Sequence, residues 1–207
     1  MLKKIAITQR LYKNTNYYEI RECLDINWAV LFNEINCIPI VLMCEFDIEK
    51  IYESLQFQGV ILSGGNDLFS QSGDELSKKR DDFEKKLIEF CIKREIPLLG
   101  VCRGMQVIAE FFGSTFKEIS NQVNIRHKLE VSPNSKYFDE LSKIESVNSY
   151  ANFFIDTLSD ELMLSAKSDN IIRAIEHKEH KILGIMWHSE RENPPSKAQN
   201  LLIKSFF

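Results

Sequence analysis

The chain has 207 residues, of which 44% are hydrophobic and 27% are charged, and its formal net charge is −4. This composition predicts a globular protein, which we take as a single domain over residues 1–207, and no basic block indicates binding to nucleic acid. No apolar run reaches the roughly 18 to 20 residues that span a bilayer, and the N-terminus lacks the apolar core of a signal peptide. We therefore expect a cytoplasmic location and no membrane association.

The five cysteines are odd in number, widely spread and never in a CxxC arrangement. This pattern argues against both a disulfide framework and a zinc site. We expect reduced thiols that are mostly small core residues.

The first two thirds of the chain alternate segments typical of strands with segments typical of amphipathic helices. The predicted strands are residues 3–9, 37–43, 59–65 and 97–102, and the predicted helices are residues 20–35, 47–55 and 75–95. This alternation indicates right-handed βαβ units and a parallel sheet. Such sheets bind ligands at the carboxyl ends of their strands, where two glycine-containing stretches, Gly64-Gly65 and Gly100–Gly104, both fall.

A dense charge run, KKRDDFEKK, occupies residues 78–86 of the third predicted helix. Charges on an amphipathic helix are typical of the face that points to solvent. We therefore expect these side chains to be solvated.

The last third contains short, closely spaced strand candidates, which favour antiparallel pairing. They are residues 127–131, 144–150, 162–169, 171–178 and 180–188, and a closing helix is predicted at 196–206. The predicted fold class is α/β, with three layers, a mostly parallel central sheet flanked by helices, and a small antiparallel section in the C-terminal third.

The strongest chemical signal is GVCRG, residues 100–104, at the junction of a strand and a helix. A nucleophile between glycines at this kind of junction is a nucleophile elbow, in which the neighbours two residues away must lack side chains. The helix that starts here points its free N–H groups and positive dipole end at Cys102, which favours the thiolate and can hold an oxyanion. The alternative is a buried thiol in a tight turn.

A cysteine nucleophile needs a base, and the chain offers four histidines. His177 and His180 lie in EHKEHK between two predicted strands, which indicates an exposed turn. His127 is either a rim residue of the site or a polar position of a strand.

His188 follows an apolar strand and precedes Glu190 by two residues. Residues i and i+2 of an extended segment face the same side, so this carboxylate can accept the imidazole N–H and leave the other nitrogen basic toward a thiol. A surface H-x-E at a strand end is the plainer alternative.

Together these features resemble the class I glutamine amidotransferase family, whose triad is Cys-His-Glu. The matching segments are GVCRGMQ with Cys102, MWHSERENP with His188 and Glu190, and VILSGGND with Gly64-Gly65. The resemblance spans roughly residues 57 to 192 and implies the flavodoxin-like fold of that family.

The same resemblance implies roles for further residues. The oxyanion donors would be the backbone N–H groups of Gly65 (or Gly64) and of Arg103. Gln106 matches a position that binds the glutamine moiety. The segment VNSY, with Ser149 and Tyr150, matches the segment that contacts the α-amino and α-carboxylate groups.

Within the family, SGGND together with GVCRGMQ looks most like the stand-alone γ-glutamyl hydrolases of the peptidase C26 type. Two departures stand out. These hydrolases carry NS-x-H-H-Q where this chain has NSYANF at residues 148–153, and Ser189 replaces the proline of their H-P-E. The first departure leaves the leaving group open, because that loop lines the leaving-group side.

The N-terminal segments ITQRL and YYEIRECLDINW look similar to those of the bacterial enzymes that hydrolyse γ-glutamyl-CDP-amidate in capsule phosphoramidate biosynthesis. This resemblance implies a nucleotide-linked substrate. Arg10, Tyr18 and Arg21 are candidates to contact its diphosphate, because arginine forks suit phosphate oxygens. Ordinary surface positions are the alternative for all three.

The preferred hypothesis is a cysteine-dependent hydrolase of a γ-glutamyl amide in a small molecule, which needs no cofactor and no metal. The first alternative is a glutaminase subunit that passes ammonia to a separate synthetase, since it would use the same triad. The second is a family member that only binds a ligand. The residues give no indication of the oligomeric state.

Overall fold

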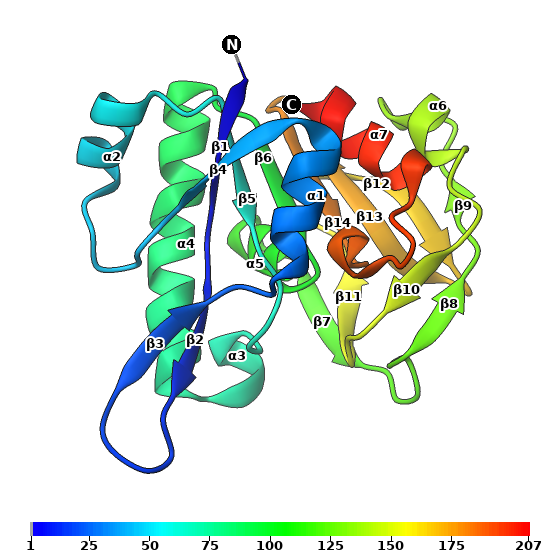
Figure 1. The fold of residues 1–207 in the computed structure, drawn as a ribbon. Helices are drawn as coiled ribbons and strands as arrows, with labels where there is room; N and C mark the ends of the chain where they lie inside the picture. The colour runs from blue at the N-terminus through cyan, green and yellow to red at the C-terminus, as the bar shows by residue number, and fades with distance from the viewer. Residues whose placement is uncertain (1) are drawn as a thin grey trace.

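The computed structural model describes residues 2–207, and an eight-stranded sheet forms its centre (Figure 1). The strand order is β4-β1-β5-β6-β14-β13-β12-β9. The five parallel strands are β4 (Cys37–Val41), β1 (Lys3–Ile7), β5 (Gly59–Leu62), β6 (Leu98–Val101) and β14 (Ile182–Ile185). The antiparallel section continues with β13 (Ile171–His177), β12 (Leu162–Ser168) and β9 (Glu130–Val131).

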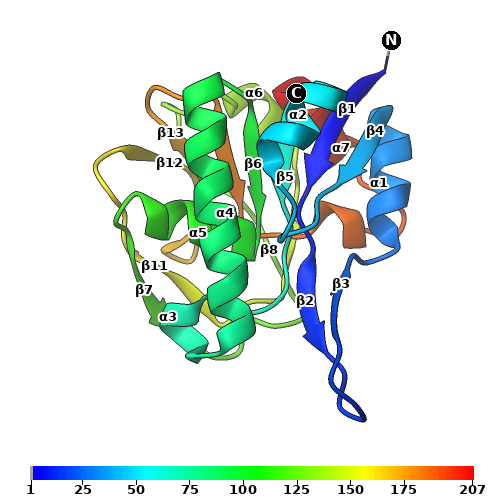
Figure 2. The same ribbon diagram turned by 90° about the vertical axis from the view of Figure 1, so that its left-hand side faces the viewer.

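Helices cover both faces of the sheet. Two of them, α4 (Glu75–Arg94) and α5 (Arg103–Phe111), pack on one face, and α1 (Asn27–Ile35) and α7 (Lys197–Phe206) pack on the other (Figure 2). Three shorter helices are α2 (Ile48–Leu55), α3 (Phe69–Ser72) and α6 (Phe138–Leu141). The predicted fold class, a three-layer α/β fold with a mostly parallel sheet and an antiparallel section, is confirmed.

Every residue of the three central strands β5, β6 and β14 is buried. Strands that are covered by helices on both faces need continuous apolar runs, and GVIL, LLGV and ILGI supply them. No helix among residues 2–207 is long and apolar enough to cross a membrane.

One strand of the last third differs from the predicted pairing. β14 is antiparallel to β13 on one side but parallel to β6 on the other. It therefore joins the two sections of the sheet, and its carboxyl end lies at the same edge as that of β6.

The helix predicted at residues 20–35 is wrong in its first part. Residues 20–23 form β3 (Ile20–Cys23), which pairs with β2 (Arg10–Lys13) in a hairpin that projects from the rest of the chain in both views (Figures 1 and 2). The apolar residues that favoured a helix begin at Leu24, so the helical pattern never included the hairpin strand. α1 itself buries Trp28, Leu31, Phe32 and Ile35, as that pattern predicts.

Two further ribbons lie beside the antiparallel section. β7 (Thr115–Glu118) pairs with β11 (Phe153–Thr157), and β8 (Ile125–His127) pairs with β10 (Val147–Ser149). The segment between β10 and β11 runs over the carboxyl ends of the central strands, where its residues line a cavity described below.

The charge run on α4 is only partly solvated: Lys78, Lys79, Asp82 and Lys86 are exposed, but three other charged residues of the run are buried. Arg80, Asp81 and Glu84 are 1%, 3% and 0% exposed, and they share one face with the apolar residues Leu87, Ile88 and Cys91. Positions 80, 84, 87 and 91 recur at helical spacing, so the buried face is apolar where it meets the sheet core and charged further toward the N-terminus. The prediction was wrong for these three residues because a charged side chain on a helix is expected to be exposed only when no polar partner packs against it.

The glycines that flank Cys102 are required by contact between backbones. A Cβ on Gly100 would meet the backbone of Gly104, and a Cβ on Gly104 would collide with the carbonyl oxygen of Leu62 on β5. α5 therefore starts in direct contact with the strands beneath it, as the elbow interpretation predicts.

We predict that Gly104→Ala lowers the free energy of unfolding by about 3 kcal/mol or more, because an overpacked backbone contact cannot relax by side-chain rotation. Gly113→Ala is the matched control. Its Cβ would meet nothing within 4 Å, so only the cost of its positive φ of 89°, about 1 kcal/mol, applies. Urea unfolding of the two variants measures the difference, and equal losses would contradict the packing argument.

Candidate active site

Four strands of the parallel section place the candidate residues at one edge of the sheet. The register pairs Leu62 of β5 with Gly100 of β6, and Val101 of β6 with Ile185 of β14. The residues that follow these pairs are Gly64-Gly65, Cys102 and His188, so parallel pairing alone brings them to the same level. Arg10, the first residue of β2, lines the same region.

Cys102 lies in a strained backbone conformation at the end of β6. Its φ and ψ are 54° and −106°, a combination that costs a non-glycine residue about 1–3 kcal/mol and persists only where the surroundings enforce it. Here the Cys102 N–H donates to the carbonyl of Ile185 at 2.7 Å, and the Cys102 carbonyl accepts from the N–H of Gln106 at 3.1 Å. Cys102 is thus the N-cap residue of α5, although its thiol makes no capping hydrogen bond, and the Arg103 N–H follows it directly.

His188 and Glu190 form a buried pair. The Nδ1 atom of His188 lies 2.6 Å from Oε1 of Glu190, and the two side chains are 2% and 1% exposed. The contact arises through a short 3-10 turn, η1 (Ser189–Arg191), and not through the extended segment that the sequence suggested. The carboxylate engages Nδ1 and leaves Nε2 of the ring free for the thiol side.

Burial opposes a charge on His188, but the Cys102 thiolate and the Glu190 carboxylate outweigh it and raise the pKa of His188 to about 10. The imidazole next to the Cys102 thiol therefore carries a proton at neutral pH. An imidazolium beside a thiolate is the arrangement that a cysteine nucleophile with an acid partner requires.

Asn148 on β10 holds the backbone of His188 from both sides. Its Oδ1 atom accepts from the N–H of His188 at 2.8 Å, and its Nδ2 atom donates to the His188 carbonyl at 2.8 Å. Nδ2 also donates to Glu192 at 2.8 Å. The sequence analysis singled out the VNSY segment for its following residues, and this asparagine was missed because its contact joins residues 40 positions apart.

The loop after β5 lies directly against His188. A Cβ on Gly64 would come within 2.5 Å of Cε1 of His188, so glycine allows the ring to approach the loop backbone. Gly65 has a φ of 84°, a value that glycine adopts without strain. The loop thus presents backbone next to the histidine, as an oxyanion-binding loop must.

Two cavities meet at this point. The first, of about 340 Å³, is lined by Cys102, Arg103, Gln106 and residues 150–153 of the β10–β11 segment. The second, of about 250 Å³, is lined by Asp25, Trp28, Gly64 and Glu190, among others. Both are lined by Arg10, Gly65, His188 and Arg191. A larger cavity of about 460 Å³, between α2 and α4, contains none of the candidate residues, so the chemistry of the lining places the site here.

Gln106 and Tyr150 lie in the first cavity, where the sequence analysis expected substrate contacts. The Nε2 atom of Gln106 donates to the carbonyl of Phe153 at 2.7 Å, which ties α5 to the β10–β11 segment. The ring of Tyr150 packs edge-on against His188 with the ring centres 5.7 Å apart.

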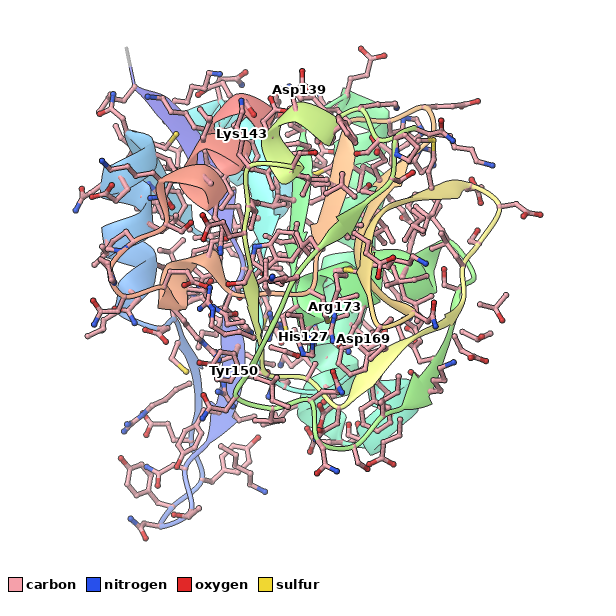
Figure 3. All side chains as sticks on the ribbon, turned by 90° about the vertical axis from the view of Figure 1, so that its right-hand side faces the viewer. His127, Asp139, Lys143, Tyr150, Asp169 and Arg173 are labelled. Carbon is pink, nitrogen blue, oxygen red and sulfur yellow. The ribbon has the colours of Figure 1, made fainter. Side chains whose placement is uncertain are left out.

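Other predicted contacts lie outside the two cavity linings. The Ser149 hydroxyl is buried and accepts from Arg173 at 3.2 Å. His127 lies beside Asp169 and Arg173, away from Tyr150 (Figure 3), with its Nδ1 atom 3.6 Å from Asp169. Burial and the charge of Arg173 lower the pKa of His127, which favours its neutral form. A direct substrate contact remains a prediction for both residues.

Tyr18 and Arg21 of the hairpin are likewise outside both linings. Tyr18 is 85% exposed near the hairpin tip, and Arg21 donates to Glu19 at 2.8 Å and to Tyr17 at 3.0 Å. Arg21 pairs across the hairpin with Tyr12, two residues beyond Arg10, so it shares a face with Arg10. Their contact with a ligand also remains a prediction.

The remaining histidine pair differs from the predicted exposed turn. His177 is 4% exposed, and its Nδ1 atom accepts from the N–H groups of Glu179 and His180 at 3.0 and 2.9 Å. It stabilises the turn between β13 and β14, far along the strand from His188.

Arg191 is the functional candidate that the sequence analysis missed. Its guanidinium lies over the ring of Tyr150, with 4.9 Å between Cζ and the ring centre, and its Nε atom is 3.8 Å from both Asp25 and Glu190. Together with Arg10 it places two positive charges where the cavities meet. Its position directly after Glu190 was the available signal.

Comparison with known proteins agrees with this geometry. The model of the peptidase C26 family matches residues 5–190. The chain is 43% identical over 207 residues to a γ-glutamyl-CDP-amidate hydrolase of Campylobacter jejuni, covering 98% of this chain and 96% of the relative. It is 30% identical over 176 residues to component 2 of anthranilate synthase from Saccharolobus solfataricus, covering 79% of this chain and 83% of the relative.

The fold has solved counterparts. A glutamine amidotransferase from Thermotoga maritima superposes with a TM-score of 0.67 at 19% identity, covering 99% of this chain and 84% of the other. At that identity the likeness concerns the fold alone. The family match over most of the chain, with the relative that is 43% identical along nearly its whole length, shows that this protein belongs to the peptidase C26 family.

Proposed function

We propose that this protein hydrolyses a γ-glutamyl amide bond, with Cys102 as nucleophile, His188 as acid and base, and Glu190 as the residue that orients His188. One observation carries the proposal. A cysteine with a strained backbone at a helix N-terminus and a buried His-Glu pair lie at the same cavity. Backbone strain and buried ion pairs both tend to cost stability. A structural role therefore does not explain why the strained Cys102 and the His188–Glu190 pair lie together.

In the first half of the reaction, the Cys102 thiolate adds to the γ-carbonyl carbon and forms a tetrahedral oxyanion. The backbone N–H groups of Gly65 and Arg103 stabilise this oxyanion, each donor contributing about 3 kcal/mol. The His188 imidazolium transfers its proton to the amide nitrogen as the C–N bond breaks. A γ-glutamyl thioester and a free amine or phosphoramidate result.

In the second half, neutral His188 removes a proton from water, and the resulting hydroxide attacks the thioester carbonyl. The C–S bond breaks, glutamate leaves, and the thiolate and imidazolium are restored. The raised pKa of His188 suits this cycle, because the acid form is regenerated at neutral pH.

The two cavities divide the substrate between them. The first contains Cys102, Gln106 and Tyr150, and we assign it to the glutamyl moiety, so residues 150–153 would lie on the glutamyl side and not on the leaving-group side that the resemblance implied. The second lies beyond His188, on the side to which the leaving nitrogen departs, and we assign it to the leaving group.

The arginines at the cavity junction favour an anionic leaving group, while the carboxylates of the second cavity, Asp25 and Glu190, lie against Arg191 and His188. Arg10 and Arg191 line the junction, and guanidinium groups bind phosphate oxygens through paired N–H donors. The relative from Campylobacter jejuni acts on γ-glutamyl-CDP-amidate by name. We therefore propose γ-glutamyl-CDP-amidate as the substrate, with Tyr18 and Arg21 on the adjoining hairpin as outer contacts.

A cytoplasmic location is part of the same proposal. All five cysteines are free, and a catalytic thiol has to stay reduced.

The second candidate function is a glutaminase subunit that supplies ammonia to a synthetase, which the likeness to an anthranilate synthase component favours. Purified chain offered glutamine and γ-glutamyl-CDP-amidate in parallel distinguishes the two. A kcat/KM that is higher for the nucleotide substrate supports the hydrolase, whereas glutamine turnover that rises only with a synthetase supports the subunit.

We predict that Cys102→Ala abolishes hydrolysis of every γ-glutamyl substrate, since no thioester can form. Mass spectrometry of quenched wild-type reactions should detect a glutamyl adduct on the peptide containing Cys102. Cys91→Ala, which removes a buried thiol from α4 outside the site, should retain activity. Turnover by the Cys102→Ala variant would refute the mechanism.

We predict that Glu190→Gln moves the alkaline limb of the kcat/KM profile to lower pH and lowers kcat by about 10- to 100-fold. The carboxylate raises the pKa of His188, so its loss lowers that pKa and the imidazolium is lost earlier as the pH rises. In the wild type this limb should lie near pH 10. Cys102, Glu190 and Arg191 are the charged groups around the ring.

Glu53→Gln, a change on the exposed face of α2, serves as the control for that profile. An alkaline limb that stays in place in Glu190→Gln would contradict the assigned role of Glu190.

We predict that Arg10→Ala and Arg191→Ala each raise KM for γ-glutamyl-CDP-amidate about tenfold, the loss expected for one charge-assisted contact. The same variants should change KM for glutamine by less than about threefold, since its leaving group is ammonia. Arg21→Ala should have a smaller effect, because its guanidinium already binds Glu19 and Tyr17. Equal losses on both substrates would show that these arginines do not select the leaving group.

A further inference from the structure

The side chain of Arg80, buried on α4, makes most of its hydrogen bonds to the loop that follows β5. Its Nη2 atom donates to the carbonyl of Ser63 at 2.6 Å and to the Ser63 hydroxyl at 3.1 Å. Its Nη1 atom donates to the carbonyl of Gly64 at 3.1 Å, to that of Gly65, and to Oδ1 of Asn66 at 3.3 Å. One guanidinium thus holds consecutive carbonyls of the oxyanion loop.

The direction of these bonds determines where the opposite side of each peptide points. In a trans peptide the C=O and the following N–H lie in one plane and point in opposite directions. Arg80 holds the carbonyl of Gly64 from the α4 side, so the N–H of Gly65 is directed away from α4. Gly65 lines both cavities on that other side, next to His188.

A positive charge on a peptide oxygen also polarises the peptide. Hydrogen bonds to a carbonyl strengthen the donor capacity of the N–H in the same unit, and burial increases the effect because the local dielectric is low. The Arg80 guanidinium is 1% exposed, so water screens it little. Burial lowers the pKa of Arg80 to about 10, which still leaves the group protonated at neutral pH.

Glu84 connects this arginine with the other predicted oxyanion donor. Its Oε1 atom accepts from Nε of Arg80 at 3.0 Å and from the Thr8 hydroxyl at 2.7 Å, and its Oε2 atom accepts from Nη1 of Arg103. Asp81 binds the second Nη atom of Arg103. One turn of α4 therefore anchors the loop that contains Gly65 and the elbow residue Arg103.

A purely structural role, holding α4 rigidly against the loop, would not require buried charged side chains. Replacing a buried ion pair by apolar side chains of similar volume is often neutral or stabilising, so such pairs are weak evidence for a purely structural role. An apolar side chain at position 80, however, could not hold the carbonyls of Ser63 and Gly64. The hydrogen bonds from the guanidinium to these loop carbonyls therefore explain why position 80 is an arginine.

We propose that Arg80 is a positioning residue for the oxyanion hole: it orients and polarises the Gly64–Gly65 peptide so that the Gly65 N–H stabilises the tetrahedral intermediate. Glu84 holds Arg80 in place and couples it to Arg103. The proposal rests on the proposed function, because it assumes an oxyanion formed at Cys102. The proposal adds that the residues that hold the oxyanion loop in place, Arg80 and Glu84, lie on α4, outside the substrate cavities.

The experiment compares Arg80→Gln and Arg80→Lys with the wild type, using γ-glutamyl-CDP-amidate and glutamine as substrates. Loss of one oxyanion donor lowers kcat by about 100- to 1000-fold, so we expect about 100-fold for Arg80→Gln and about tenfold for Arg80→Lys, with KM within about threefold. Lysine keeps the charge but cannot reach several carbonyls at once. It decides the question if the glutamine variant does not fold.

A second readout separates this role from damage to the fold. Alkylation of Cys102 by iodoacetamide needs the thiolate and its access but forms no oxyanion. Its rate should stay within about twofold in both variants, because the environment that ionises the thiol is unchanged. Arg94→Gln, at the far end of the same helix and in an exposed pair with Glu49, is the matched control and should leave kcat unchanged.

Unchanged kcat in folded Arg80→Lys and Arg80→Gln would overturn the proposal, as would a parallel fall in the alkylation rate. Both outcomes differ from failure of the proposed function, which would appear as a wild-type chain without γ-glutamyl hydrolysis or as turnover by Cys102→Ala.

Discussion

The parallel pairing of β14 with β6 is the interaction on which the candidate site depends. These two strands are 80 residues apart in the chain, and their register sets Ile185 beside Val101. Because both strands run in the same direction, the residues after them leave the sheet at the same edge, and Cys102 is brought to His188. The bond from the Cys102 N–H to the Ile185 carbonyl extends this ladder into the elbow itself. An antiparallel β14 would place His188 at the opposite edge.

Around this pair the chain uses backbone more than side chains. Gly64, Gly100 and Gly104 each lack a side chain because another group lies where the Cβ would be: the His188 ring, the start of α5, and β5. This backbone packs closely at the strand ends, and we propose that its N–H groups are the donors that an acyl-transfer reaction needs. The polar side chains that remain, such as Asn148 and Arg80, bind backbone atoms of the same loops.

The charge distribution follows from the same construction. Between α4 and α5 the buried charges occur as two arginines and two carboxylates that pair with one another, which keeps the cluster neutral although it is removed from water. Burial acts against ionisation of Glu84, but Arg103 and Arg80 outweigh it and lower the pKa of Glu84, so the carboxylate stays charged. At the cavity junction Arg10 and Arg191 instead line both cavities, and Arg191 also lies over the ring of Tyr150. The buried cluster holds the loops of the site in place, whereas Arg10 and Arg191 are the charges that we propose bind the substrate.

The sequence by itself determined the fold class, the strand ends that matter and the identity of the three residues proposed to react, because apolar periodicity and glycine spacing are local properties of the chain. Family membership followed from the same motifs. Only the tertiary structure decided the rest. The hairpin at residues 10–23 depends on cross-strand pairing, and the direction of β14 depends on which strand it joins. The burial of Arg80, Asp81 and Glu84 depends on polar partners that come from three other segments, so a charge run that reads as solvated became the support of the site.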